Sequence, residues 1–196
     1  IHLREDRRHI QDRDLRVMRE TVQVPLNLEM AVTEEMIGIA LAHPPYTVTL
    51  VPEKREELTT EGGLDVVLHQ PRLSSVVKLL SDHGITVSLF IDPDPDQIHA
   101  SHAIGAPVVE LHTGHYANLQ GSAQQRELLR IQNGAQLAAE LGLTVHAGHG
   151  LTCGNTPAIA AIEEIVELNI GHAIVSDAVM VGLAQSIAAF RRAMVR

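Results

Sequence analysis

Short apolar runs alternate along the chain with longer stretches in which apolar residues recur at helical spacing. Apolar runs of strand length are typical of parallel sheets, whose strands are covered on both faces. We expect strands at His2–Leu3, Leu26–Met30, Thr47–Val51, Ile85–Ile91, Pro107–His112, Leu143–Ala147 and Leu168–Ile170. We expect helices between them, at Asp14–Thr21, Glu34–Leu41, Leu73–Asp82, Asp96–Ile104, Gln124–Leu141, Pro157–Val166 and Ala178–Val195.

Residues with special backbone preferences mark several of these helix ends. Gly84 and Gly142 each stand directly before an expected strand, where a left-handed residue commonly closes a helix. Thr33 precedes Glu35 and Met36, so its side chain is placed to cap the first turn of a helix. These three residues indicate where two of the expected helices end and where a third begins.

Regular strand–helix alternation predicts a parallel sheet with helices outside it, because parallel strands need crossover connections. No change in composition divides the chain, so we expect one domain over residues 1–196. The expected strands number fewer than the eight of a (β/α)8 TIM barrel, and the first is already under way at Ile1. We therefore expect such a barrel with its first βα unit missing from this chain. The alternative is an open doubly wound sheet, although no GxGxxG turn supports a dinucleotide-binding version.

The composition of the chain argues against several classes of function. The chain has 196 residues, 45% of them hydrophobic, a net charge of −9 and only 2% aromatic residues. This acidic, aromatic-poor composition argues against nucleic acid as a partner. No apolar run approaches the roughly 20 residues of a membrane span, and the start of the chain is unlike a signal peptide. A single cysteine, Cys153, fits a reducing environment, so we expect a cytoplasmic protein.

Acidic and imidazole side chains gather where the expected strands end. Glu29 and Glu110 end two different strands, and His149 follows a third, between two glycines. In a barrel, the carboxyl ends of the strands share one rim, where catalytic residues lie. A structural pair between Glu29 and Arg4 is the alternative for that carboxylate. Two carboxylates and several histidines on one rim favour acid–base chemistry.

Two groups of residues have the composition of anion sites. Gly148, Gly150 and the segment 169–172 precede expected helices, where backbone N–H groups hold phosphate, although such glycines also serve simply as tight turns. A second group consists of Arg4, Arg7, Arg8 and His9, which could equally form a solvated charged surface. The polar loop Thr59–Gly63 is of a kind that closes on ligands. Two anion sites on one rim imply two phosphorylated substrates or one bisphosphate.

Metal and Schiff-base chemistry are less well supported. The pairs His112/His115 and His146/His149 have a spacing that metal ligands use, but no cysteine cluster or HExxH helix accompanies them. The only lysines are Lys54 and Lys78, and Lys54 lies in a charged segment that keeps it protonated. We expect no metal site.

Several motifs, in this order along the whole chain, resemble the pyridoxine 5′-phosphate synthase family of vitamin B6 biosynthesis. They are HLREDRRHI, NLEMAVTEEM, LVPEKREELTTEGGLDV, VSLFID, ELHTGHYA, AGHGLT and ELNIGHAIV. The resemblance implies a cytoplasmic (β/α)8 barrel that assembles into a homo-octamer. It also implies a transferase that condenses 3-amino-2-oxopropyl phosphate with 1-deoxy-D-xylulose 5-phosphate. The products are pyridoxine 5′-phosphate, phosphate and water, and no metal or organic cofactor is needed.

The same resemblance implies roles for individual residues. His2 and Glu29 match the family's two general bases, His149 its proton donor, and Glu110 the group that stabilises developing charge. The positions that hold the deoxyxylulose phosphate correspond to Arg4, His9 and Thr59, and those that hold the aminoacetone phosphate to Gly150, Gly171 and His172.

Three features depart from the family pattern. The family's NIDH-type motif is not in this chain, His146 replaces a usual asparagine, and Ser176-Asp177 replaces a common Gly-Arg. Asp177 would place a negative charge in the turn after His172 and weaken phosphate binding there. Two alternatives to the synthase therefore stand beside it. One is an inactive truncated barrel that retains phosphate binding, and the other is a metal-dependent phosphosugar epimerase.

Overall fold

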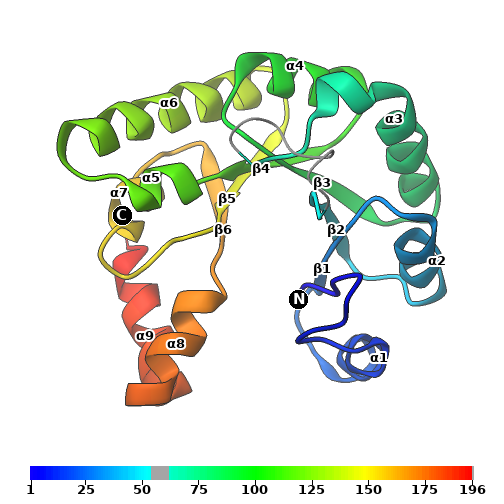
Figure 1. Cartoon of the computed structure of the whole chain (residues 1–196), viewed down its shortest axis with the longest axis horizontal. Helices are drawn as coiled ribbons and strands as arrows, with labels where there is room; N and C mark the ends of the chain where they lie inside the picture. The colour runs from blue at the N-terminus through cyan, green and yellow to red at the C-terminus, as the bar shows by residue number, and fades with distance from the viewer. Residues whose placement is uncertain (54–61, 196) are drawn as a thin grey trace.

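A computed structural model of the chain describes residues 1–53 and 62–195. Within these residues, six parallel strands form one sheet in the order β1-β2-β3-β4-β5-β6. The strands are β1 Asn27–Met30, β2 Thr47–Leu50, β3 Thr86–Ile91, β4 Val108–His112, β5 Thr144–Gly148 and β6 Ile165–Asn169. Figure 1 shows them as an arc with helices along its outer side.

The strand order identifies the type of α/β fold. Each strand pairs with the next one in the sequence, and the order never reverses. A doubly wound sheet has a point at which the order reverses, whereas a barrel is wound in one direction. The expected class is confirmed: the sheet is a curled half-barrel of the TIM-barrel kind, and the doubly wound alternative is wrong. His2 extends the sheet beyond β1 through a single parallel bridge to Glu29, in place of the expected strand.

The helices follow the expected alternation, with changes at several boundaries. Those described are α1 Asp12–Thr21, α2 Glu34–Ala42, α3 Val66–Asp82, α4 Pro95–Ala103, α5 Gly114–Asn118, α6 Gly121–Glu140, α7 Thr156–Ala160, α8 His172–Val181 and α9 Leu183–Ala193. The Thr33 side chain accepts a hydrogen bond from the Met36 N–H, which confirms the predicted cap of α2. Gly84 and Gly142 have φ of +77° and +83°, the left-handed conformation predicted for them.

Three expected elements near the C-terminal end have wrong boundaries. The predicted helix Pro157–Val166 ends at Ala160, and β6 begins at Ile165, three residues before the predicted strand. The predicted helix Ala178–Val195 is two helices, because Gly182 has φ of +86° and breaks the run between α8 and α9. The short helix α5 was not predicted.

The two faces of the sheet differ in chemistry. One set of alternate strand positions, including Leu28, Met30 and Val109, is fully buried in the apolar core beneath the helices. The other set carries polar side chains such as Thr49, Ser88 and Glu110, all at most 3% exposed. Side chains alternate across a strand, so this polar set faces the inside of the arc. The polar side chains suited to a reaction therefore lie on the inner side of the arc.

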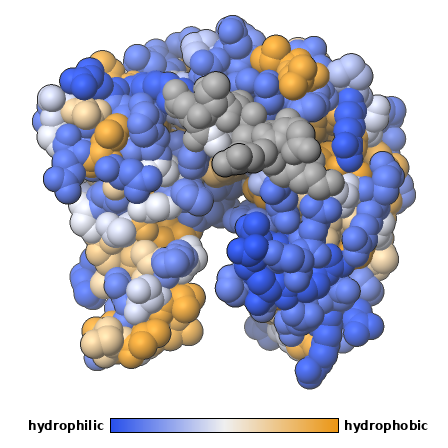
Figure 2. Space-filling view, in the orientation of Figure 1, coloured by the Kyte–Doolittle hydropathy of each residue, from blue (hydrophilic) through white to orange (hydrophobic). Residues whose placement is uncertain are grey.

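The ends of the arc differ as well. Figure 2 shows apolar surface over the C-terminal end and hydrophilic surface over the N-terminal end, with a hollow between them. On α8, Val179 and Met180 are 80% and 84% exposed. None of the helices among residues 1–53 and 62–195 is both long and apolar enough to span a membrane.

Candidate active site

The residues expected to carry chemistry lie at the carboxyl end of the sheet. Glu29 is in β1, Glu110 is in β4, His149 directly follows β5, and His172 begins α8. The negative charge of Glu29 raises the pKa of both Glu110 and His149. The structure therefore gathers on one rim the acids and bases that the sequence placed at separate strand ends.

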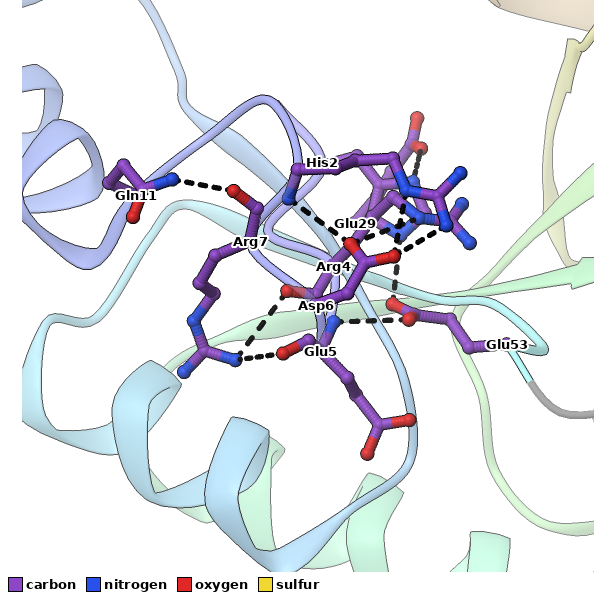
Figure 3. A network of polar contacts seen from close by, with 9 residues as sticks. His2, Arg4, Glu5, Asp6, Arg7, Gln11, Glu29 and Glu53 are labelled. Atoms are coloured by element: carbon purple, nitrogen blue, oxygen red, sulfur yellow. Dashed lines mark hydrogen bonds and ion pairs between the residues drawn. The ribbon is translucent and has the colours of Figure 1, made fainter.

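His2 lies between two carboxylates (Figure 3). Its Nδ1 is 3.4 Å from Oε2 of Glu29, and its Nε2 is 3.1 Å from Oε1 of Glu53. The Glu53 side chain is only 5% exposed and also accepts a hydrogen bond from the backbone N–H of Glu5. Glu29 thus pairs with His2, whereas the sequence left open a pair with Arg4. The contact of Glu53 with His2 was not predicted, although its place just after a strand was a signal.

Glu110 is almost completely buried, with 3% of its surface exposed. The Asn169 amide donates a hydrogen bond to its Oε2 at 2.7 Å. Burial, with the negative charges of Glu29 and Glu167, raises the pKa of Glu110 to about 8, against a smaller opposing effect of the Asn169 hydrogen bond. The Glu110 carboxyl therefore carries a proton at neutral pH.

His149 has an unusual backbone for a residue other than glycine, with φ of +82°. The Thr113 N–H donates to the Gly148 carbonyl at 2.8 Å, and the Thr113 hydroxyl lies 2.7 Å from both the Gly148 and His149 carbonyl oxygens. These bonds hold the strained turn in place. Desolvation lowers the pKa of the His149 imidazole, as do nearby His112 and His172, while Glu29 opposes them.

His146 is buried beside Glu110, its partner in the pairing of β4 with β5. Its Nδ1 lies 3.6 Å from Oε1 of Glu167 and makes no hydrogen bond among the described residues. Burial lowers the pKa of His146, and the charge of Glu167 opposes this effect. The departure from the family at this position thus lies within the site itself.

The arginine group divides into two kinds. Arg7 pairs with Asp12 at 3.0 Å and with Glu35 at 2.6 Å, and Arg8 pairs with Asp6. These two arginines fit the alternative of a charged surface. Arg4 is different, because its buried Nε has no hydrogen-bond partner within the described part of the chain and lies 3.9 Å from Asp6.

The other residues expected to bind an anion together with Arg4 are His9 and Thr59. His9 is exposed. The candidate Thr59 and the lysine Lys54 lie outside the described residues, as does most of the loop Thr59–Gly63.

Two glycines occupy matching places after the last two strands. Gly148 and Asn169 are register partners, so Gly150 and Gly171 each stand two residues beyond the same pair. Gly150 has φ of +75°, and a Cβ there would lie 2.7 Å from the Ala117 side chain. Gly171 is the N-cap of α8 and forms no side-chain cap, so the first N–H groups of that helix are available to an anion. Asp177 lies inside α8 and is exposed, not in the turn where it was expected.

The histidine pairs with ligand spacing do not converge on one point. His112 contacts Asp92 at 3.1 Å, whereas His115 lies 3.7 Å from Glu127. Among residues 1–53 and 62–195, no group of three or more histidine, cysteine or acidic side chains is arranged to hold a metal ion.

Comparison with known proteins identifies relatives of this chain. The family model described as pyridoxal phosphate biosynthesis protein PdxJ matches residues 1–196. A pyridoxine 5′-phosphate synthase from Citrifermentans bemidjiense is 56% identical over 188 residues, which cover 95% of this chain and 79% of that protein.

Two solved structures share the fold at low sequence identity. One, described as "Native KDPGal structure", has a TM-score of 0.61 at 11% identity and covers 98% of this chain and 81% of its own. The other, a xylose isomerase domain protein from Planctomyces limnophilus, has a TM-score of 0.50 at 14% identity and covers 88% and 71%. These likenesses extend to the fold alone. The match over the full sequence goes further, and the chain belongs to the PdxJ family of pyridoxal phosphate biosynthesis proteins.

Proposed function

We propose that this chain is a pyridoxine 5′-phosphate synthase that condenses 3-amino-2-oxopropyl phosphate with 1-deoxy-D-xylulose 5-phosphate. The 56% identical relative with that name and the family match support the activity. The identity of the two substrates is inferred from the resemblance of the sequence motifs to this family. Residues 1–196 act as one barrel domain in this proposal, within a cytoplasmic homo-octamer.

The observation that carries the proposal is the set of unlike proton affinities on one rim. Glu110 has a pKa raised to about 8, whereas His149 has a lowered pKa. The reaction joins an amine to a ketone, expels phosphate and water, and closes an aromatic ring, so protons move at every stage. Groups that hold different protonation states in one pocket are what such a sequence needs.

Each group has a role that its surroundings support. His2 and Glu29 act as the bases, and the carboxylates of Glu29 and Glu53 on either side of His2 hold its ring in position. His149 is the proton donor, and its lowered pKa makes the protonated ring a stronger acid. Glu110, protonated and buried, donates a hydrogen bond to oxygen atoms that become negative.

The two phosphate groups bind on opposite sides of these groups. Arg4, whose buried Nε makes no hydrogen bond among the described residues, binds the deoxyxylulose phosphate together with His9 and Thr59. The start of α8 at Gly171 and His172, together with Gly150, binds the aminoacetone phosphate. Holding both substrates by their phosphates supplies the proximity that a condensation requires. The substrates provide the imine and the leaving group, so the proposal includes no metal or organic cofactor.

The test is a two-substrate assay on the purified full-length protein, with the product identified by chromatography and mass spectrometry. We expect pyridoxine 5′-phosphate only when both substrates are present, and a large loss of product in Glu29→Gln. Binding of each phosphorylated substrate without product would instead support the inactive barrel. Stoichiometric zinc or iron with epimerase activity would support the metal-dependent alternative and overturn the proposal.

A further inference from the structure

Asp92 and His112 form a buried pair beside the proton donor of the proposed reaction. Asp92 follows β3 and His112 ends β4, and Oδ1 of Asp92 lies 3.1 Å from Nδ1 of His112. Their side chains are only 4% and 11% exposed. The Gly63 N–H donates to the other oxygen of Asp92 at 3.3 Å. The carboxylate is thus held from two sides.

This contact fixes which nitrogen of His112 carries a proton. An ionised carboxylate only accepts hydrogen bonds, so Nδ1 of His112 is the donor. The carboxylate consequently sets the orientation and the tautomer of the imidazole, as it does for histidines in catalytic triads and around metal sites. The other edge of the His112 ring is turned away from Asp92.

The His112 ring also packs against His149. The rings of His112 and His149 have centroids 5.0 Å apart in an edge-to-face arrangement at 71°, and Phe90 lies 5.0 Å from His112 and 6.2 Å from His149. A Cβ on Gly114 would lie 2.5 Å from Nε2 of His112 and 2.7 Å from Cδ2 of His149. Only glycine at this position leaves room for both rings.

We propose that Asp92 and His112 are positioning residues that hold the His149 imidazole in its working orientation, and that Gly114 makes room for their contact. This inference rests on the proposed function for its catalytic meaning. The pair acts through His149 and does not need to touch substrate. In this arrangement the Asp92 carboxylate orients the His112 imidazole, and the His112 imidazole packs against that of His149.

The same contact has an electrostatic consequence. The titratable groups that act on His149 are Glu29 from β1, His112 from β4 and His172 from the start of α8. After desolvation, the electrostatic influence of His112 is the next cause that lowers the pKa of His149. Removal of the His112 ring therefore raises the pKa of His149, because both the repulsion and part of the desolvation are lost.

The sharpest variant is His112→Asn. An asparagine amide nitrogen takes nearly the place of Nδ1, so it still donates to Asp92 while the ring against His149 is lost. We expect a normal melting temperature, a kcat lowered roughly 10- to 100-fold and a KM nearly unchanged. His115→Asn is the matched control, since His115 is half exposed and pairs with Glu127, and it should leave kcat unchanged.

A second measurement needs no substrate. Diethyl pyrocarbonate acylates the neutral imidazole, so its rate at His149, followed by peptide mass spectrometry across pH, reports the protonation of that residue. In His112→Asn the midpoint should move to higher pH, and in His115→Asn it should stay in place. An unmoved midpoint in His112→Asn overturns the proposal. A moved midpoint in a protein that makes no pyridoxine 5′-phosphate supports the pair and overturns only the proposed function.

A double-mutant cycle separates positioning from general damage. If His112 acts through His149, the loss caused by His112→Asn should disappear in a His149→Asn background. Additive losses in the two variants would show that His112 acts independently of His149 and would overturn the proposal.

Discussion

The Asn169 amide at the end of β6 donates a 2.7 Å hydrogen bond to the Glu110 carboxyl in β4, across the intervening strand β5. The bond passes over β5 at Gly148, where a side chain would collide with Glu110. Three neighbouring strands thus contribute to the placement of one buried carboxyl group. Its proton affinity and the space around it are both properties of the assembled sheet.

Glu110 should make the stability of the protein fall as pH rises. Its pKa is raised from an ordinary 4.5 to about 8 in the folded state, so the folded protein holds a proton that the unfolded chain has lost. The stabilising proton is fully effective below the unfolded pKa and is lost as pH rises through the folded pKa. Between these values the slope is about 1.4 kcal/mol per pH unit.

Glu110→Gln removes this titration and leaves an oxygen for Asn169. From about pH 5 to about pH 8, the wild-type free energy of unfolding should fall relative to the variant by something on the order of 4 kcal/mol. Urea unfolding of both proteins at the two pH values measures the difference. Parallel pH dependences would mean that Glu110 is already ionised in the folded protein.

Gly148→Ala should disturb the site by steric contact. The new Cβ would collide with the Glu110 carboxyl and lie 2.9 Å from the Asn169 carbonyl oxygen. We expect a loss of about 1–3 kcal/mol in stability, as for overpacked interiors, together with lower synthase activity. Gly154→Ala is the control, since its nearest neighbour would be Thr152 Oγ1 at 3.9 Å and its stability should change by less than about 0.5 kcal/mol. Equal effects of the two substitutions would contradict the argument.

The site could be predicted only in part from the sequence. Strand ends and flanking glycines pointed to Glu29, Glu110 and His149, because parallel strands bring their carboxyl ends to one rim. The contact between Asp92 and His112 joins residues 20 positions apart at the ends of neighbouring strands, and no local pattern encodes it. The pairing of Arg7, which precedes α1, with Glu35 in α2 likewise joins residues far apart in the sequence.

Thr33→Ala should destabilise α2 without touching the site. The Thr33 hydroxyl accepts the Met36 N–H, and this donor has no partner in the helix once the cap is removed. We expect a loss of about 1 kcal/mol in the free energy of unfolding, measured by urea titration, with kcat unchanged. Thr33→Ser retains the hydroxyl and should recover most of the loss. A similar loss in the serine variant would show that the methyl group, not the cap, matters.

The fold could be predicted from the sequence more fully than the site. The errors in the predicted element boundaries have physical causes. β6 was placed too late because it is an edge strand whose Val166 and Glu167 are exposed, so it lacks a continuous apolar signal. The break between α8 and α9 was missed because apolar residues continue on both sides of Gly182. In the first case, the exposure of the strand in the folded protein hid its boundary. In the second, the positive φ of Gly182 ended the helix although the apolar pattern continued.

Glu53→Gln should disturb the position of the proposed base His2. The Glu53 carboxylate lies 3.1 Å from Nε2 of His2 and is nearly buried, so this contact fixes the orientation of the imidazole. Glutamine keeps an oxygen for the Glu5 N–H but removes the charge. We expect kcat to fall by roughly 10- to 100-fold with a smaller change in KM, as for other residues that orient a catalytic group.

The matched control for this substitution is Glu34→Gln, which removes one exposed carboxylate from the first turn of α2. It should leave kcat within about twofold of wild type, since an exposed charge away from the rim is screened by solvent. Steady-state kinetics with each substrate varied in turn, together with melting temperatures for both variants, separate a loss of catalysis from a loss of fold. If Glu53→Gln raises KM and leaves kcat intact, Glu53 serves binding, and His2 does not depend on its charge during the chemical steps.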